Sequence, residues 1–443
     1  MERLTGIEVQ ELDKEYVMHS WSKQGTASIP VEKAEGIYFY DYDGKRYADM
    51  SSLLVCSNLG HGNREIIDAI KEQAEKMAFM APAYATEPKS KLAKMLIDIS
   101  EDNMKKVFFT NAGADANENA MKMAKMVTGR SKIFSRYRSY HGSTLGAGNA
   151  SGDPRRFSVE NPAASGFVKF IDPYTYRDQL RFKDDEEASK YYLRLLEDQL
   201  IYEGPYNVAG IIMESITGAN GVLIPPKGYM EGVRELCDKY GIMMICDEVM
   251  SGFARTGKMF AFQNFNVKPD MVTFAKGATC GYVQLGGVIV SGEIADYFKD
   301  NVLQCGLTYS GHTLACAAGV ASVGYYEKYN ICDHVNKVGK VLADFLDEMV
   351  EKHPCVGEAR HIGLFTALEL VKNKETREPL VPYGVGNTIM PSIMGELKKR
   401  GFATFGRENN INICPPLIIT EEELMEQLPI LDEVLTIVDE KYL

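Results

Sequence analysis

The chain has 443 residues, of which 45% are hydrophobic and 25% charged, and its formal net charge is −12. That length suits one large and one smaller domain, and the composition is that of an ordinary soluble globular protein. The negative charge argues against nucleic acid or an anionic membrane as the main partner.

No apolar run approaches the roughly 18 residues of a membrane span, and residues 1–14 lack the apolar core of a signal peptide. The nine cysteines are scattered without a Cys-x-x-Cys pair, and several, such as Cys246 and Cys316, lie in apolar or small-residue stretches. This usage is typical of reduced, buried thiols. Neither zinc nor iron–sulfur ligand spacing is present. We therefore predict a cytoplasmic protein without a metal site.

The first recognisable element is a β-hairpin within residues 30–50, where apolar runs at 37–40 and 46–48 flank an Asp-Gly turn. From about residue 105 to 290, short apolar runs alternate with helical patterns. Their apolar residues are continuous, which is typical of strands buried on both faces of a parallel sheet. Residues 151–205 contain turn signals and a charged helix, and we expect them to leave the sheet. The predicted strand cores are 107–109, 133–134, 208–213, 242–246, 271–274 and 288–290.

After about residue 315, amphipathic helices surround short strands. The last helix begins with the capping box Thr420-x-x-Glu423 and contains Pro429, which should remove a hydrogen bond and bend it. Its apolar stripe consists of Leu424, Leu428, Leu431, Leu435 and Val438. We predict an α/β protein with a mostly parallel sheet in a large domain, residues 61–310. The smaller α/β domain combines residues 1–60 with residues 311–443.

Two polar residues stand where apolar runs end. Asp247 follows residues 242–246, and Lys276 follows residues 271–274. Ligands bind at the carboxyl edge of such a sheet. An acid and a lysine there fit pyridoxal phosphate (PLP), to which the lysine forms a Schiff base while the aspartate partners the pyridinium nitrogen. The alternative is that Asp247 caps a turn and Lys276 is a solvated surface lysine, and spacing alone does not decide between them.

Neighbouring residues favour the cofactor. Residues 110–120 open a helix after a strand, so Gly113 and Ala114 can offer backbone amides to a phosphate. The alternative is a glycine-containing connection without function. Tyr140 follows another strand and can stack on a ring, with His141 orienting nearby groups, although local packing would explain both equally well. Other candidates are Glu214 at a third strand end, Val249 beneath a planar ring, and Thr308 in a hydroxyl cluster suited to phosphate.

Together these segments resemble the class III (ω-amino acid) aminotransferases, PLP enzymes of the aspartate-aminotransferase fold. The resemblance runs from about residue 20 to the C-terminus and is strongest at 246–258, 269–270 and 276–277. It implies that Lys276 carries the cofactor and that Asp247 partners its nitrogen. Val249 and Tyr140 would cover the two ring faces, and Gly113 and Ala114 would bind the phosphate. Thr308 would reach that phosphate from the other subunit of a homodimer or a dimer of dimers.

The chain departs from the family pattern at two places. Residues 112–115 read Ala-Gly-Ala-Asp where the family often has Ser-Gly-Ser-Glu, which removes a hydroxyl from the phosphate site. Residues 311–313 read Gly-His-Thr where a proline is usual in third place. Backbone donors can compensate for the first change, and the second removes no catalytic group.

Substrate recognition is predicted from fewer residues. Arg407 matches an arginine that the family uses for the acceptor's carboxylate, to which a guanidinium makes two parallel bonds. The alternative is a surface arginine paired with Glu408; Arg360 is a second candidate. Trp21 would wall the donor pocket or, alternatively, anchor the N-terminal segment. Residues 50–55 and the Arg-x-Asn at Arg407 look closest to taurine-type aminotransferases.

The sequence thus predicts ping-pong transamination from a small ω-amino donor (taurine, β-alanine or a 4-aminobutyrate-like homologue) to 2-oxoglutarate or pyruvate. A PLP-dependent aminomutase, racemase or decarboxylating enzyme of the same fold would use the same lysine and aspartate. A non-catalytic scaffold with a vestigial site is a third possibility, against which the intact Asp247, Lys276, Tyr140 and Thr308 argue.

Overall fold

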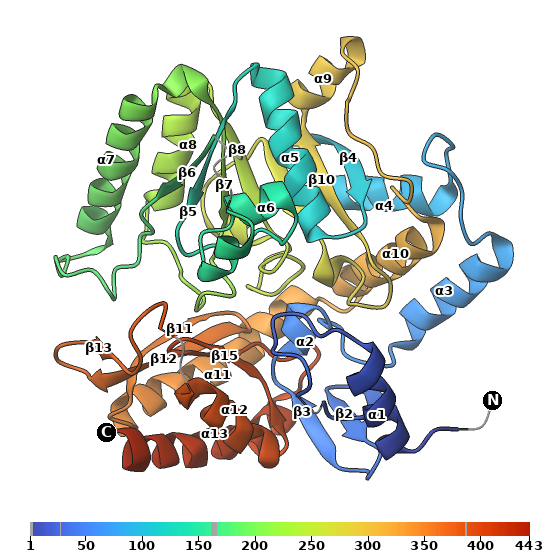
Figure 1. Cartoon of the computed structure of the whole chain (residues 1–443). Helices are drawn as coiled ribbons and strands as arrows, with labels where there is room; N and C mark the ends of the chain where they lie inside the picture. The colour runs from blue at the N-terminus through green and yellow to red at the C-terminus, as the bar shows by residue number, and fades with distance from the viewer. Residues whose placement is uncertain (1–2, 27, 161–165, 386–387) are drawn as a thin grey trace.

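The computed structural model describes residues 3–26, 28–160, 166–385 and 388–443. Figure 1 shows a large body built on one sheet, with a smaller body beneath it. The seven strands of the large sheet lie in the order β4-β10-β9-β8-β7-β5-β6. Their bounds are β4 Met104–Thr110, β5 Lys132–Arg136, β6 Phe167–Phe170, β7 Val208–Glu214, β8 Met243–Asp247, β9 Met271–Phe274 and β10 Gly286–Ser291.

The strands from β9 to β6 run parallel, while β10 is antiparallel to both β4 and β9. Every residue of β7 and β8 is buried. Their continuous apolar runs are therefore explained by helices on both faces, and the predicted α/β architecture with a mostly parallel sheet is confirmed. One expectation was wrong: residues 151–205 do not stay off the sheet, because β6 forms its edge beside β5.

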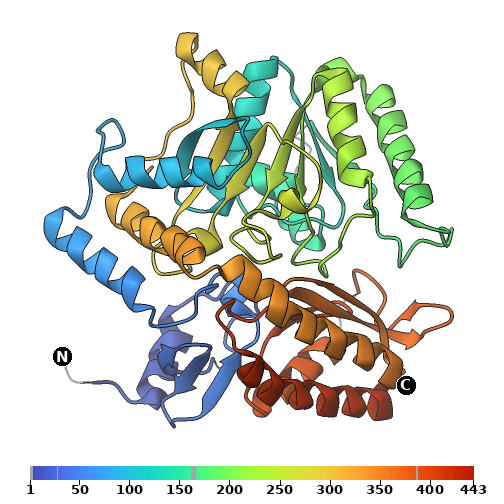
Figure 2. The ribbon, with the colours of Figure 1, turned by 180° about the vertical axis from the view of Figure 1, so that it is seen from behind.

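Helices cover the large sheet on both sides. On one side α5 (Gly113–Thr128) contacts several strands, and α6 (Leu145–Ala150) lies beside it. Seen from behind, α10 (Thr313–Lys328) packs against α3 (Arg64–Lys76) and α4 (Glu87–Asp98) (Figure 2). The remaining helices of this body are α7 Asp185–Glu203, α8 Tyr229–Tyr240 and α9 Gly292–Asp300. None of the helices in the described ranges is both long and apolar enough to cross a membrane.

The two ends of the chain meet in the smaller body. The predicted hairpin forms from β2 (Tyr38–Asp41) and β3 (Arg46–Asp49), and β3 then pairs in parallel with β14 (Phe402–Ala403). A second sheet has the order β11-β12-β16-β15, with β13 beside β12. The bounds are α1 Gly6–Tyr16, β1 Val31–Glu35, α2 Ser52–Val55, α11 Ile331–Lys352, β11 Val356–Ile362, β12 Phe365–Asn373, β13 Glu378–Pro379, α12 Ile389–Lys399, β15 Phe405–Arg407, β16 Asn410–Ile413 and α13 Glu421–Tyr442.

The last helix agrees with its sequence pattern. Thr420 and Glu423 form the predicted capping box, and all five residues of the apolar stripe are buried. Pro429 lies inside α13, which continues past it to Tyr442. The stripe thus joins the core of the smaller body.

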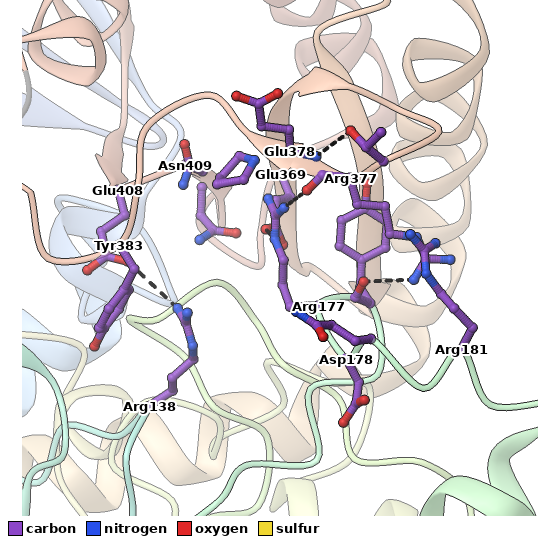
Figure 3. Close-up of a pocket in the computed structure, with 15 residues that line it drawn as sticks. Arg138, Arg177, Asp178, Arg181, Glu369, Arg377, Glu378, Tyr383, Glu408 and Asn409 are labelled. Carbon is purple, nitrogen blue, oxygen red and sulfur yellow. Dashed lines mark hydrogen bonds and ion pairs between the residues drawn. The ribbon is translucent and has the colours of Figure 1, made fainter.

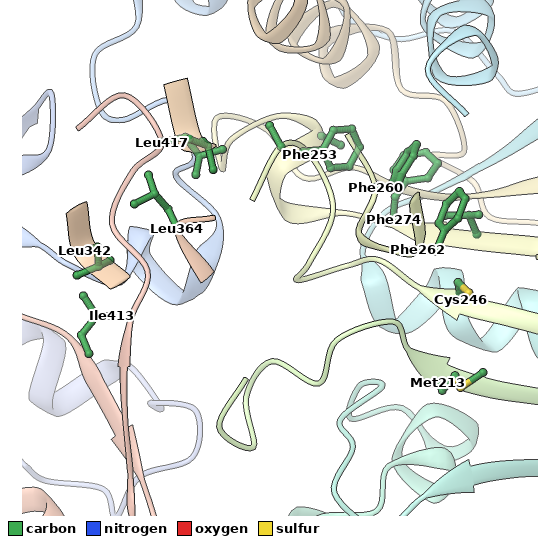
Figure 4. Packing of buried hydrophobic residues seen from close by; sticks show 14 of the residues in the cluster. Met213, Cys246, Phe253, Phe260, Phe262, Phe274, Leu342, Leu364, Ile413 and Leu417 are labelled. Carbon is green, nitrogen blue, oxygen red and sulfur yellow. The ribbon is translucent and has the colours of Figure 1, made fainter. Parts of the chain in front are cut away.

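An aromatic cluster backs the edge of the sheet from which Lys276 emerges. Phe253 packs edge-on against Phe274, with ring centroids 6.1 Å apart, and against Phe260 at 5.5 Å (Figure 4). A Cβ atom at Gly277 would lie 2.8 Å from the Phe253 Cβ. Glycine after Lys276 therefore lets the chain lie directly on the core.

Candidate active site

Three strand ends bring charged residues to one edge of the sheet. Glu214 ends β7 and lies opposite Asp247, which ends β8. Lys276 follows β9 by two residues, in the 3₁₀ turn Lys276–Ala278. Because these strands are parallel, their carboxyl ends share the edge at which ligands bind in this architecture.

A cavity of about 960 Å³ opens at this edge. It is lined by ten of the twelve candidate site residues: Trp21, Gly113, Ala114, Tyr140, His141, Glu214, Asp247, Val249, Lys276 and Arg407. The other two, Thr308 and Arg360, lie outside this lining, and Thr308 is exposed.

Asp247 is held by a buried network of hydrogen bonds. Its Oδ2 accepts from His141 Nδ1 at 2.7 Å and from Asn117 Nδ2 at 2.8 Å, while its Oδ1 accepts the Val249 amide at 3.0 Å. Asn117 Oδ1 in turn accepts from the Thr273 hydroxyl at 2.7 Å. Donors on both oxygens fix the orientation of this buried carboxylate, which lines the cavity.

Lys276 differs from Asp247 in having no partner among the residues that the structure describes. Within the described ranges no side chain or carbonyl accepts a hydrogen bond from its Nζ, and none pairs with it. Its backbone has φ +39°, an unusual value for a residue other than glycine. A strained, unpaired lysine in a cavity is a feature of functional sites.

The N-terminus of α5 lines one part of the cavity. Ala112 at the N-cap makes no side-chain hydrogen bond, so the first amides of the helix are uncapped. Gly113 lies against Val249: a Cβ there would meet the two Val249 methyl carbons at 2.8 and 2.9 Å. Free amides and the positive end of the helix dipole suit a phosphate.

Glu214 orders the loop that carries Tyr140. Its two carboxylate oxygens accept the amides of Tyr140 at 3.1 Å and Gly218 at 2.7 Å. Burial raises the pKa of this carboxyl, and the neighbouring His141 opposes the shift. The second nitrogen of His141, Nε2, is buried without a partner.

Two arginines line the cavity and share one carboxylate. Asp153 is fully buried and pairs with Arg155, whose Nη2 lies 2.5 Å from Oδ2, and with Arg407, whose Nη2 lies 3.3 Å from Oδ1. Burial alone would raise the pKa of Asp153, but the hydrogen bonds and charge of Arg155 and the charge of Arg407 hold it below its usual value. The Arg155 guanidinium covers the Tyr140 ring at 3.6 Å, and the Trp21 ring meets Tyr140 edge-on at 6.2 Å.

The alternatives for the substrate arginines can now be resolved. Arg407 pairs with Asp153, and the ion-pair partner of Glu408 is Arg138. The second candidate, Arg360, was wrong: it is buried outside the cavity and bonded to Glu358 and Glu369. Its ion pair with Glu369 joins β11 to β12.

Comparison with known proteins identifies the family. The family model for class III aminotransferases matches residues 20–435. The chain belongs to the class III aminotransferases. Its fold is accordingly that of the aspartate aminotransferase-like transaminases, as its sequence resemblance implied.

Several class III aminotransferases resemble it over nearly their whole length. The crystal structure of taurine:2-oxoglutarate aminotransferase from Bifidobacterium kashiwanohense, in complex with PLP and glutamate, is 67% identical, covers 100% of both chains and superposes with a TM-score of 0.99. Taurine–pyruvate aminotransferase of Bilophila wadsworthia is 34% identical over 98% of each chain. Mitochondrial gamma-aminobutyrate transaminase 1 of Oryza sativa subsp. japonica is 35% identical over 95% of this chain and 84% of that protein.

Class III aminotransferases use PLP, and the cavity fits that group. An unpaired lysine, a buried carboxylate and an uncapped helix N-terminus face one space, which is the donor set that its aldehyde, ring nitrogen and phosphate require. Gly113 and Val249 lie so close together that any larger residue at position 113 would collide with the Val249 side chain.

Four residues of this class III site were not predicted from the sequence: Asn117, Thr273, Asp153 and Arg155. Asn117 lies in the segment that was predicted to bind phosphate. Its contact with Asp247 could not be predicted, because tertiary packing decides which face of α5 points toward Asp247. Asp153 stands in a Gly-Asp-Pro sequence that indicated only a turn. An acid and an arginine two residues apart in a loop carry no specific signal.

Proposed function

We propose that this enzyme transfers the amino group of taurine, or of a similarly small ω-amino acid, to 2-oxoglutarate by a ping-pong mechanism with PLP. The single observation that carries the proposal is the pair of arginines, Arg155 and Arg407, on one buried aspartate in the cavity of Lys276. The similarity to the Bifidobacterium taurine:2-oxoglutarate aminotransferase supports the same substrates.

The charges favour 2-oxoglutarate over pyruvate as acceptor. Arginine recognises carboxylates and sulfonates through paired, charge-assisted hydrogen bonds. A dicarboxylate can engage both cations, whereas pyruvate has one carboxylate and would engage only one of them, with the other arginine still on Asp153. Taurine has a single sulfonate, so one arginine would hold the donor while the other stays on Asp153.

The chemistry assigns a separate role to each residue. Bound PLP draws electrons from the carbon that carries the amino group. Asp247 would hold the proton on the ring nitrogen, because a neighbouring carboxylate favours the protonated form. Lys276 would hold the aldehyde group, and its Nζ would act as the general base that moves a proton away from that carbon. Tyr140 and Val249 would support the two faces of the ring.

We propose that the active unit is at least a dimer. Thr308 is exposed and lies outside the cavity of its own chain, so its hydroxyl is free to serve the phosphate of a second copy. The nine cysteines are all free thiols, which favours a reducing compartment, and the cytoplasm remains our proposed location.

The proposal is tested by a donor and acceptor screen on the purified enzyme. Taurine, β-alanine, 4-aminobutyrate and L-alanine are each combined with 2-oxoglutarate and with pyruvate, and the amino acid formed is quantified. We expect taurine with 2-oxoglutarate to give the highest kcat/KM. Transfer from L-alanine alone would refute an ω-amino donor. Each donor is also added without an acceptor, because a transaminase then converts the bound cofactor into its amino form whereas a racemase leaves it unchanged.

A further inference from the structure

Arg407 is carried by a tight turn whose next residue makes its own ion pair. Arg407 ends β15 and pairs with Asn410 of β16, so Glu408 and Asn409 form the connection. Glu408 has φ +53°, in the left-handed region that residues other than glycine rarely adopt. Such a backbone persists only where surrounding contacts hold it.

Two ion pairs tie this turn to the large body. Arg407 reaches Asp153, and the Glu408 Oε2 lies 3.7 Å from Arg138 Nη1. Arg138 belongs to the loop after β5 that also carries Tyr140. The side chains of Arg138 and Glu408 are only 22% and 19% exposed, so solvent screens this pair less than an ordinary surface pair.

Arg138 is itself fixed on several sides. Its amide donates to Asp172 Oδ2 at 2.9 Å, and its guanidinium lies over the rings of Tyr383 at 4.3 Å and Tyr174 at 5.1 Å. Figure 3 shows Arg138, Tyr383 and Glu408 gathered on one side of a second cavity. Arg138 is therefore a rigid anchor for the turn.

The two pairs face different spaces. Arg407 lines the main cavity with Lys276, whereas Arg138 and Glu408 line the second cavity, of about 330 Å³. The pair therefore has no direct access to a substrate in the main cavity. Burial raises the pKa of the Glu408 carboxyl, and the charges of Arg138 and Arg407 oppose the shift.

We propose that Glu408 and Arg138 are positioning residues that hold Arg407 in place to receive the substrate's anionic group. This proposal rests on the proposed function. When a carboxylate or sulfonate draws Arg407 away from Asp153, the aspartate keeps Arg155 as its partner. The turn keeps its Arg138 anchor, so only the Arg407 side chain has to move. Without that anchor, Arg407 would lose its fixed starting point and bind anions less well.

The test uses glutarate, a dicarboxylate of the same length as 2-oxoglutarate that cannot react. Its dissociation constant on the PLP-loaded enzyme is measured by calorimetry for the wild type, Glu408→Gln, Arg138→Gln and the double variant. We expect each single change to weaken binding about tenfold, with no further loss in the double variant because both remove one interaction. The matched control is Glu378→Gln, a carboxylate of the same second cavity whose partner is Lys372.

Kinetics provide the second readout. In Glu408→Gln, KM for 2-oxoglutarate and for taurine should rise with kcat nearly unchanged, while the half-reaction with a primary amine that carries no acidic group should proceed at the wild-type rate. Unchanged glutarate affinity in Glu408→Gln, or an equal loss in Glu378→Gln, would overturn the positioning role. If the wild-type enzyme bound glutarate but did not use taurine, the proposed donor would be refuted. The glutarate affinities of the variants would still test the positioning role.

Discussion

Asn117 holds Asp247 from one side while Thr273 holds Asn117 from the other. The amide Nδ2 donates to Asp247 Oδ2 at 2.8 Å, and the Thr273 hydroxyl donates to the amide oxygen at 2.7 Å. The Thr273 contact fixes which end of the amide faces Asp247. We therefore expect Asn117→Ala to lower kcat/KM roughly 10- to 100-fold, because a buried hydrogen bond to a charge is lost.

The matched control lies on the same helix. Asn119 donates to the Asp115 carbonyl at 2.7 Å and makes no contact with Asp247, so Asn119→Ala should retain near wild-type kcat/KM. Equal losses in the two variants would show that α5 is merely destabilised and that Asn117 has no special role.

Gly113→Ala should weaken cofactor binding by steric conflict. The new Cβ would lie 2.8 Å from one Val249 methyl and 2.9 Å from the other. It would therefore displace the Val249 side chain, which is proposed to pack against the cofactor ring. Overpacking of this kind predicts a rise in the PLP dissociation constant of roughly 5- to 100-fold, measured by titration of the cofactor-free enzyme. Adding Val249→Ala should recover part of the affinity; no recovery would place the effect elsewhere.

Arg155→Gln tests the proposal that 2-oxoglutarate is bound by both Arg155 and Arg407. Because pyruvate needs one arginine and 2-oxoglutarate can use two, KM for 2-oxoglutarate should rise by roughly 10-fold or more, and KM for pyruvate by clearly less. Arg407→Gln should raise both. Equal effects of Arg155→Gln on the two acceptors would mean that Arg155 only covers Tyr140, over whose ring it lies at 3.6 Å.

We expect Lys169 to make the free energy of unfolding depend on pH. Its Nζ donates to Ser135 Oγ at 2.9 Å and to the Ala150 carbonyl at 3.0 Å, and burial, with the charge of Arg156, lowers its pKa from 10.5 to about 7. Between these two values the unfolded chain binds a proton that the folded protein lacks, so stability from this group rises with pH. From pH 7 to pH 9, the free energy of unfolding should therefore increase more in the wild type than in Lys169→Met. Parallel denaturation profiles would contradict this.

The sequence was most informative where strands end. Asp247, Glu214 and Lys276 each follow an apolar run, and parallel strands necessarily bring such residues to one edge. The buried core of the sheet was equally visible, because strands covered on both faces have no polar residues to interrupt them. The antiparallel direction of β10 was not visible, because its apolar run, residues 288–290, looks like that of a parallel strand.

Residues in loops could not be placed from the sequence. The contacts of Asp153 and Arg155 depend on the path of the chain between Tyr140 and β6, and that path is set by tertiary packing. Trp21 and Arg407 come from opposite ends of the chain, and only the folded protein shows that they line one cavity. Thr308 depends on a second copy of the chain, so its predicted role remains a prediction.

The most direct test of the account is to reduce the purified enzyme with borohydride and map the pyridoxyl group by peptide mass spectrometry, with and without prior incubation with taurine. The account predicts that the label lies on Lys276 alone and that taurine removes it, because the cofactor leaves the lysine when it accepts the amino group. A label on another lysine, or a label on Lys276 that taurine leaves unchanged, would contradict it.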